Sequence, residues 1–368
     1  MNLQKLYAPI IKTGDAELKA LANLSNDTLE KICPIIELTR GRKSKNDIIG
    51  TLNKRLDKLK KINLNHFFID ITSDELLSNI ELEVLHSYTG GYHNWCDFCK
   101  QLKQYFPNIL PVIQIEECTD YNVYIDNLYL QVKRLLESFD YVLFRSQDEK
   151  GTIDTISDVN AMLLKDHSIS TSQLIYLLDY KYIKDANTSI DSAMKFIEVL
   201  NNRLNIHNII LSSTSFPNSV SEIMEEDASY IELPLQERSF FSNVKKQVKN
   251  FTNLNLLYSD YASINPNRND TVIMARGWIP RIDIPTLNSI NIMRKRRGNG
   301  NYANRYKEIA IAVCHTEYFK SLCLLIDCWG IDEIKNTAQG IIPSASPQFW
   351  ISIRMNIYIS LLTNIFPL

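Results

Sequence analysis

Short apolar runs that alternate with longer amphipathic stretches are the feature that most restricts the fold of this chain. Eight such runs lie at residues 6–12, 32–38, 66–71, 109–115, 141–145, 174–179, 208–213 and 230–235. They are nearly continuous in Val, Ile, Leu, Phe and Tyr, which is typical of strands buried on both faces of a helix-covered parallel sheet. Eight strand–helix units in about 250 residues predict an α/β protein, a (β/α)8 TIM-like barrel over residues 1–262.

The pattern leaves open an alternative fold and the choice of the eighth strand, and the C-terminal residues depart from it. An open doubly wound sheet is the main alternative, although no strand-to-helix turn here reads G-x-G-x-x-G as that fold usually does. A ninth apolar run, at 255–260, competes with the run at 230–235 for the place of the eighth barrel strand. Residues 263–368 are predicted to form a C-terminal α/β extension packed on the barrel, with strands at 271–279 and 290–297 and helices at 304–319 and 349–366.

Each predicted barrel strand ends in a polar residue. These residues are Lys12, Glu37, Asp70, Gln114, Arg145, Asp179, Ser212 or Ser213, and Glu232, with Asp260 after the ninth run. In a barrel the carboxyl ends of the strands face the active-site mouth. Because burying an unpaired charge costs several kcal/mol, we expect these side chains either to line a functional mouth or to form an ion network that closes the barrel.

A mouth of this composition suits a phosphate-bearing ligand such as a nucleotide or nucleic acid. The cations Lys12 and Arg145 would hold the phosphate, and Gln114 and Glu232 would be further ligand contacts. Carboxylates at such a site act as general acid and base or bind a divalent cation. The candidate catalytic residues are Glu37, Asp70, Asp179 and Asp260. If the chain is an enzyme, this pattern predicts a phosphodiesterase- or nuclease-like hydrolase, with a divalent metal as a possible cofactor.

Two other motifs offer weaker chemistry. The segment "HNWCDFC" contains His93, Cys96 and Cys99, but a structural zinc site needs four ligands and no second pair lies nearby. Buried cysteines on a helix are therefore the favoured interpretation. Cys314 stands beside His315, yet no Asp or Asn partner for a nucleophilic site can be named.

Two stretches are strongly basic. Residues 291–307 hold six cations and no acid, with two tyrosines between them. They could supply a secondary phosphate contact through Arg294, Arg296 and Arg297, but a solvated turn between two elements is the favoured interpretation. Residues 40–61 are also basic, and apolar positions at three- and four-residue spacing predict an amphipathic helix over 45–62 whose charges face solvent.

Composition restricts where the protein acts. The net charge of −2 provides no general field for nucleic acid or anionic membranes, so a basic patch must act locally. No apolar run reaches the length of a bilayer span, and the first residues lack the pattern of a signal peptide. Seven scattered cysteines suit a reducing compartment. We therefore expect a cytoplasmic protein without membrane contact.

Several short motifs give the chain a resemblance to a known family. They are "YAPIIKTGDAELKALANL", "ICPIIEL", "LLYSDYASINP", "MARGW", "CWGIDEI" and "SPQFWISIRMNIYI". Taken together, they resemble the beta protein family, named for a T-even bacteriophage protein and found also in bacteria. The resemblance implies a barrel with an extension and a part in phage–host conflict, and it implies no defined activity. Its hallmark positions here are Lys12, Glu37, Asp260 and Arg276, and Tyr358 stands near the place where the family pattern has a histidine.

Two hypotheses of function follow. The first is a barrel whose mouth binds, and in its stronger form hydrolyses, a phosphate-bearing ligand, with Arg276 reaching over the mouth from the extension. The second is a non-catalytic scaffold that recognises a protein partner in a phage-encoded or phage-defence complex. In the scaffold hypothesis the contacts come from extension aromatics, which are Trp278, Trp329, Phe349 and Trp350.

Overall fold

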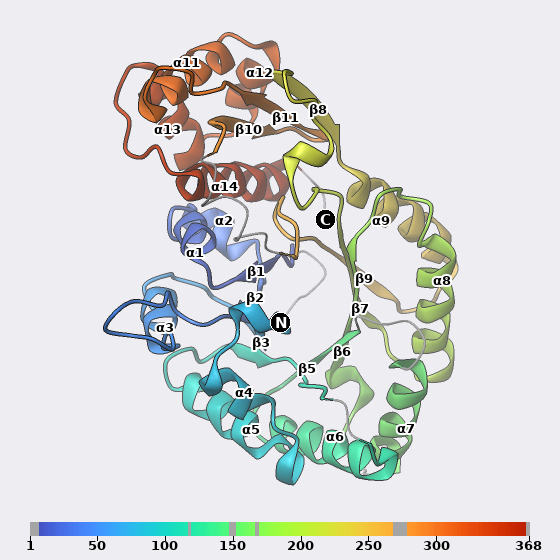
Figure 1. The fold of residues 1–368 in the computed structure, drawn as a ribbon. Helices are drawn as coiled ribbons and strands as arrows, with labels where there is room; N and C mark the ends of the chain where they lie inside the picture. The colour runs from blue at the N-terminus through green and yellow to red at the C-terminus, as the bar shows by residue number, and fades with distance from the viewer. Residues whose placement is uncertain (1–6, 117–118, 147–151, 166–168, 268–277, 366–368) are drawn as a thin grey trace.

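Two four-stranded parallel sheets, flanked by helices, form the larger part of the molecule in this computed structural model (Figure 1). The structure describes residues 7–116, 119–146, 152–165, 169–267 and 278–365. The first sheet contains, in order, β1 (Ile10–Lys12), β2 (Ile35–Leu38), β3 (Phe67–Ile71) and β4 (Ile109–Pro111). The second contains β5 (Val142–Ser146), β6 (Leu174–Tyr182), β7 (Asn208–Thr214) and β9 (Asn255–Ser259). The predicted α/β class with parallel strands is confirmed.

The two sheets meet at both of their edges. A single parallel bridge pairs Val112 with Leu143 beside β4 and β5. At the other edge, the backbone N–H groups of Ala8 and Ile10 donate to the carbonyls of Tyr258 and Asp260, at 3.2 and 2.7 Å. The strand ladders themselves stop short of one continuous sheet.

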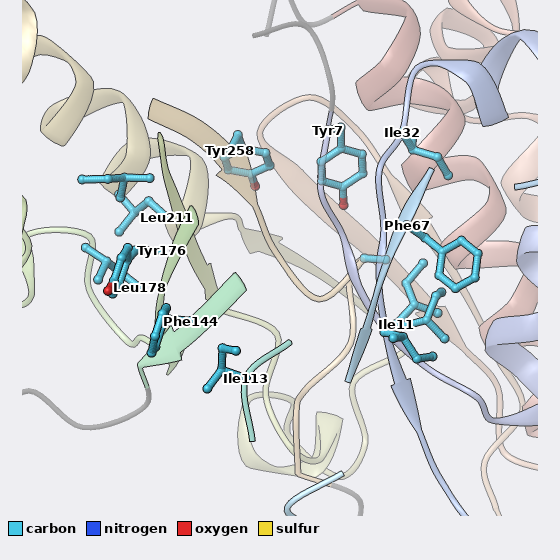
Figure 2. Packing of buried hydrophobic residues seen from close by; sticks show 14 of the residues in the cluster. Tyr7, Ile11, Ile32, Phe67, Ile113, Phe144, Tyr176, Leu178, Leu211 and Tyr258 are labelled. Carbon is cyan, nitrogen blue, oxygen red and sulfur yellow. The ribbon is translucent and has the colours of Figure 1, made fainter. Parts of the chain in front are cut away.

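Each strand is buried on both faces, as its continuous apolar run predicts. One face of both sheets shares a common cluster that includes Ile10, Ile35, Phe68, Leu143 and Leu257. The other face packs against the helices in a larger cluster, in which Phe144 stacks on Tyr176 at 4.9 Å and Tyr7 on Tyr258 at 5.8 Å (Figure 2).

Helices follow the strands and cover the outer face. They are α1 (Asp15–Ala22), α2 (Asn26–Glu30), α3 (Asn53–Leu59), α4 (Ile80–His86), α5 (Thr89–Lys103), α6 (Tyr121–Leu136), α7 (Thr152–Lys165), α8 (Ile190–Glu198) and α9 (Gln236–Gln247). The helix predicted over 45–62 is wrong in its first part, because α3 begins only at Asn53. Gly50 has φ +69°, which a helix cannot continue through, and Ile48 is 80% exposed instead of packed.

The question of the eighth strand is settled by β9, which pairs in parallel with β7. The competing run at 230–235 forms β8 (Tyr230–Pro234), which belongs to a separate antiparallel sheet with β11 (Ser289–Arg294) and β10 (Arg281–Pro285). The expectation that Glu232 ends a barrel strand is therefore wrong. One strand of this sheet, β8, comes from the part of the chain before residue 263. The predicted boundary between two domains at 262/263 stays a prediction.

The rest of the chain covers this antiparallel sheet with helices. They are α11 (Tyr302–Cys314), α12 (Glu317–Leu325), α13 (Trp329–Ala338) and α14 (Pro347–Ile365). The helix predicted at 349–366 and the strand predicted at 290–297 are confirmed. The helix predicted at 304–319 is wrong as one element, because α11 ends at Cys314 and α12 begins at Glu317. The strand predicted at 271–279 lies mostly outside the described residues. Helix α14 lies beside α1 (Figure 1), where the Asn356 amide donates to the carbonyls of Ala20 and Asn23.

Candidate ligand site at the strand ends

The polar residues that end six strands converge in one hydrogen-bonded group, as predicted for them. Lys12 Nζ donates to Glu37 Oε1 at 2.7 Å, and Gln114 Nε2 donates to Asp70 Oδ1 at 3.1 Å. Arg145 and Asp179 complete the group from the second sheet. We call this group, together with Tyr261, the strand-end cluster.

Arg145 holds the two sheets together within this cluster. Its Nη1 donates to Glu37 at 3.1 Å and to Asp70 at 2.7 Å. Its Nε and Nη2 both donate to Asp179 Oδ2, at 3.0 and 2.8 Å, and the Tyr261 hydroxyl also donates to Asp179. A planar guanidinium with a fixed fork of donors is suited to binding three carboxylates at once.

The strand pleat explains why these residues meet. Lys12, Glu37 and Asp70 lie in register across β1, β2 and β3, two residues beyond the inner-face residues Ile10, Ile35 and Phe68. Because side chains two residues apart along a strand share a face, all of them point to the same side as the inner cluster.

The same rule selects Ser212, rather than Ser213, as the predicted strand-end residue on this face, and it adds Ser259, which the prediction did not single out. Ser212 on β7 and Ser259 on β9 lie in register with each other, and Ser212 lies in register with Asp179. Both hydroxyls are buried, and neither has a hydrogen-bond partner among the described residues. The polar layer therefore has two buried hydroxyls without a described partner on the side of β7 and β9.

The cluster carries an excess of one negative charge, since three carboxylates face two cations. Its side chains are at most 7% exposed. Burial acts to raise the pKa of Glu37, but the attraction of Lys12 and Arg145 outweighs it and lowers that pKa to about 2. Glu37 is therefore a fixed anion at neutral pH and has no proton to donate.

Asp260 lies apart from this cluster, although it was predicted to share its chemistry. It follows Ser259, so its side chain points to the opposite face of β9. Its carboxylate accepts hydrogen bonds from the hydroxyls of Tyr7, Tyr258 (2.8 Å) and Tyr358 (2.6 Å). Tyr358, at the position where the family resemblance led us to expect histidine, thus contacts a hallmark residue.

A second carboxyl lies near Asp260. Glu237, in the first turn of α9, is 1% exposed, and its Oε2 accepts from the Ser215 hydroxyl and backbone N–H. Its Oε1 has no partner among the described residues. Burial and then repulsion by Asp260 raise the pKa of Glu237 to about 7, and burial also raises the pKa of Asp260. We call Glu237, Asp260 and the three tyrosines the tyrosine cluster.

Two further ligand contacts were predicted, one from another strand and one from outside the strand ends. Glu232 lies on β8 and accepts a hydrogen bond from Ser289 at 2.6 Å. Arg276 lies outside the described residues, so its predicted contact over the mouth stays a prediction.

Most cations of the basic stretch 291–307 are held by the protein itself. Arg294 is buried, and its guanidinium donates to the backbone carbonyls of residues 225, 226 and 228. Arg296 binds the Glu226 carboxylate at 2.7 Å. Arg297 is exposed and lies 5.3 Å from the ring centre of Tyr302. These contacts fit a structural turn, and a secondary phosphate contact stays a prediction.

The segment with His93, Cys96 and Cys99 has the buried cysteines that the sequence favoured. Cys96 and Cys99 are buried, and burial raises the pKa of the Cys96 thiol to about 11. His93 is exposed, and its Nδ1 lies 2.9 Å from a backbone carbonyl. Over the residues that the structure describes, no group of three or more His, Cys, Asp and Glu side chains is arranged to hold a metal ion. None of the described helices is long and apolar enough to cross a membrane.

The aromatic side chains named in the scaffold hypothesis pack against other aromatic side chains of the extension and are not fully exposed on the surface. Phe349 and Trp350 are buried, and Trp350 stacks on Tyr306 at 4.7 Å. Trp278 stacks on Tyr302 at 4.1 Å, and Trp329 packs edge-on against Phe349. All four aromatics named in the scaffold hypothesis are thus buried or half-buried against neighbouring side chains, and the scaffold hypothesis stays a prediction.

Fold and site together define a parallel α/β protein with a charged, hydrogen-bonded cluster at the carboxyl ends of its strands. The chain belongs to the Beta protein family, whose model matches residues 7–362. Protein beta of Enterobacteria phage P4 is 27% identical over 358 residues, which cover 96% of this chain and 92% of that protein. This relative comes from phage P4, whereas the resemblance was expected to a T-even phage.

Comparison with solved structures finds distant likenesses. A fungal β-1,4-galactanase matches 70% of this chain and 89% of its own with a TM-score of 0.42 and 9% identity. A family 18 chitinase from Crocus vernus matches 69% of this chain and 91% of its own with a TM-score of 0.40 and 12% identity. At TM-scores below 0.5 these likenesses carry no information on activity.

Proposed function

We propose that this chain is a ligand-binding (β/α)8 barrel whose strand-end cluster binds a phosphate-bearing ligand, such as a nucleotide, together with a divalent cation. The observation that carries the proposal is the convergence of charged and amide side chains from six strands in one cluster. Contacts at both sheet edges, through Val112 and Leu143 and through Ala8 and Ile10, support the barrel.

The charges support a phosphate bound with a cation rather than a bare phosphate. The excess carboxylate would repel an unaccompanied phosphate, whereas a divalent cation reverses the local charge. Mg²⁺ at nucleotide sites is normally held by one or two carboxylates, by water and by the phosphates themselves. Asp70 and Asp179 can supply these one or two carboxylate ligands.

Lys12 is the group with donors left for the phosphate. Its ammonium carries three N–H groups, and its bond to Glu37 is the one partner of its Nζ among the described residues. Arg145, by contrast, already donates to three carboxylates. Since Glu37 stays ionised, it cannot act as a general acid, and we propose binding as the function. Because a relative is encoded by a phage, we propose phage–host conflict as its setting.

The test compares two buried cations in the full-length protein. Lys12→Met removes the proposed phosphate contact, and Arg354→Met removes a buried cation that is paired with Asp283 in the extension. Isothermal titration calorimetry with ATP and GTP, with and without Mg²⁺, should show binding that requires Mg²⁺ and survives in Arg354→Met but not in Lys12→Met. Melting temperatures establish that both variants are folded. No binding by the wild type, or unchanged binding by Lys12→Met, would overturn the proposal.

A further inference from the structure

The loop that follows β2 is held rigidly at its base. Gly41 N–H donates to the Gly50 carbonyl at 2.8 Å, and a Cβ on Gly50 would lie 2.2 Å from the Gly41 carbonyl oxygen. Inside the loop, the Asp47 carboxylate accepts from the backbone N–H groups of Gly50 and Thr51 and from Lys54. We call residues 41–50 the basic loop.

The basic loop carries exposed cations that make no ion pair or hydrogen bond within the described part of the protein. Arg42, Lys43 and Lys45 are all exposed, and none has an ion pair or hydrogen bond within the described part of the chain. This differs from the stretch 291–307, where Arg294 and Arg296 are bound to carbonyl and carboxylate oxygens.

Helix α3 extends the same charge along the surface. Residues 40–61 contain nine cations and two acids, in a chain whose net charge is −2. Lys58 shares Asp15 with Arg55, so one carboxylate serves two cations, and Lys61 is exposed. The basic loop and the outer face of α3, on the outside of the first sheet (Figure 1), therefore form a local concentration of positive charge.

We propose that this surface binds the phosphate backbone of a nucleic acid, through charge and not through base sequence. A linear run of cations on a rigid support matches a linear polyanion, because each contact releases a condensed counterion and needs no particular base. The hydrogen bonds at the base of the loop and around Asp47 restrict the loop backbone, which lowers the conformational entropy that the loop loses on binding. This surface is separate from the strand-end cluster, and the inference does not rest on the proposed function.

The experiment measures fluorescence anisotropy of a labelled DNA duplex of about 20 base pairs while salt is varied between about 50 and 200 mM. The test variant of the full-length protein is R42A/K43A/K45A. Its matched control is K245A/K246A/K249A, which removes three exposed lysines in the last turn of α9 and just after it and changes the net charge equally.

We expect the wild type to bind with an affinity that falls steeply with salt. Three lost contacts should lower the slope of log K against log salt by about 2.7, which corresponds to a loss of roughly 500-fold in affinity near 0.1 M salt. The control should bind like the wild type. Absence of duplex binding at low salt, or an equal loss in the control, would overturn the inference.

A second probe separates nucleic acid from membrane. Ile48 and Ile49 are exposed on the basic loop, and a membrane surface would take up these apolar side chains. Ile48→Ala should leave duplex affinity unchanged. Binding to phosphatidylserine vesicles that is lost in Ile48→Ala, without binding to the duplex, would assign the surface to lipid and reject the inference.

Discussion

Replacing Glu237 by glutamine should change how stability depends on pH. Glu237 is buried, and its pKa is raised from 4.5 to about 7. This increase in the pKa corresponds to about 3.5 kcal/mol, because one pKa unit is worth about 1.4 kcal/mol. The folded state holds this proton more tightly than the unfolded state, so the contribution is full below about pH 4.5 and is lost as pH rises through about 7.

Glutamine keeps the geometry and removes the titration. Its amide oxygen can still accept from the Ser215 hydroxyl and backbone N–H, as Glu237 Oε2 does. Its NH2 group replaces an oxygen that has no partner among the described residues, which costs about 1–3 kcal/mol at any pH. This cost cancels when the same variant is compared at two pH values.

The assay is urea unfolding, followed by tryptophan fluorescence, at about pH 5 and about pH 8. Between these values the wild type should lose about 2.5 kcal/mol more free energy of unfolding than Glu237→Gln does. Glu222→Gln, at an exposed carboxyl, controls for the loss of one charge and should behave like the wild type. Equal pH dependence in the wild type and Glu237→Gln would refute the account of this buried carboxyl.

Two further substitutions test the cluster and the loop. Arg145→Met leaves three buried carboxylates with Lys12 alone, so urea unfolding should show a loss of about 3–5 kcal/mol; a loss below about 1 kcal/mol would contradict the network. Gly50→Ala forces a methyl group onto the Gly41 carbonyl at positive φ and should cost about 2 kcal/mol or more. Gly298→Ala, also at positive φ but with 3.7 Å to the nearest atom, should cost about 1 kcal/mol; equal losses would contradict the tight loop base.

The strands and the site could be predicted because both follow from a local pattern. A run such as 66–71 can be buried on both faces only in a covered sheet, and Asp70 at its end must then meet other charges. The period of two residues along a strand could also have found Ser259 and Tyr261, which share the face of Leu257. It also separates Asp260 from them, since a shift of one residue reverses the face.

The predictions were wrong where the structure of a segment depends on contacts that the local sequence pattern does not reveal. Residues 230–235 have the composition of a buried strand, but they pair with β11, far along the sequence. The tyrosine cluster depends on the hydrogen bond from Tyr358 of α14 to Asp260. No pattern in the sequence predicts this contact between distant residues. In residues 45–62 the apolar spacing fits a helix, yet Gly50 and the carboxylate of Asp47 stabilise a loop instead.

The two buried glutamates show that the partner, not burial alone, decides the charge state. Burial acts to raise both pKa values, yet Glu37 beside Lys12 and Arg145 has a pKa of about 2, whereas Glu237 beside Asp260 has one of about 7. Glu37 therefore stabilises the fold above about pH 4.5 and loses this effect as pH falls through about 2. Glu237 stabilises the fold below about pH 4.5 and loses this effect as pH rises through about 7. Both contributions are therefore close to their full size only near pH 4.5. Acid weakens the strand-end cluster, which joins the two sheets, while base weakens the tyrosine cluster, where α9 and α14 meet β9. Unfolding at the two extremes of pH should therefore begin in different parts of the molecule.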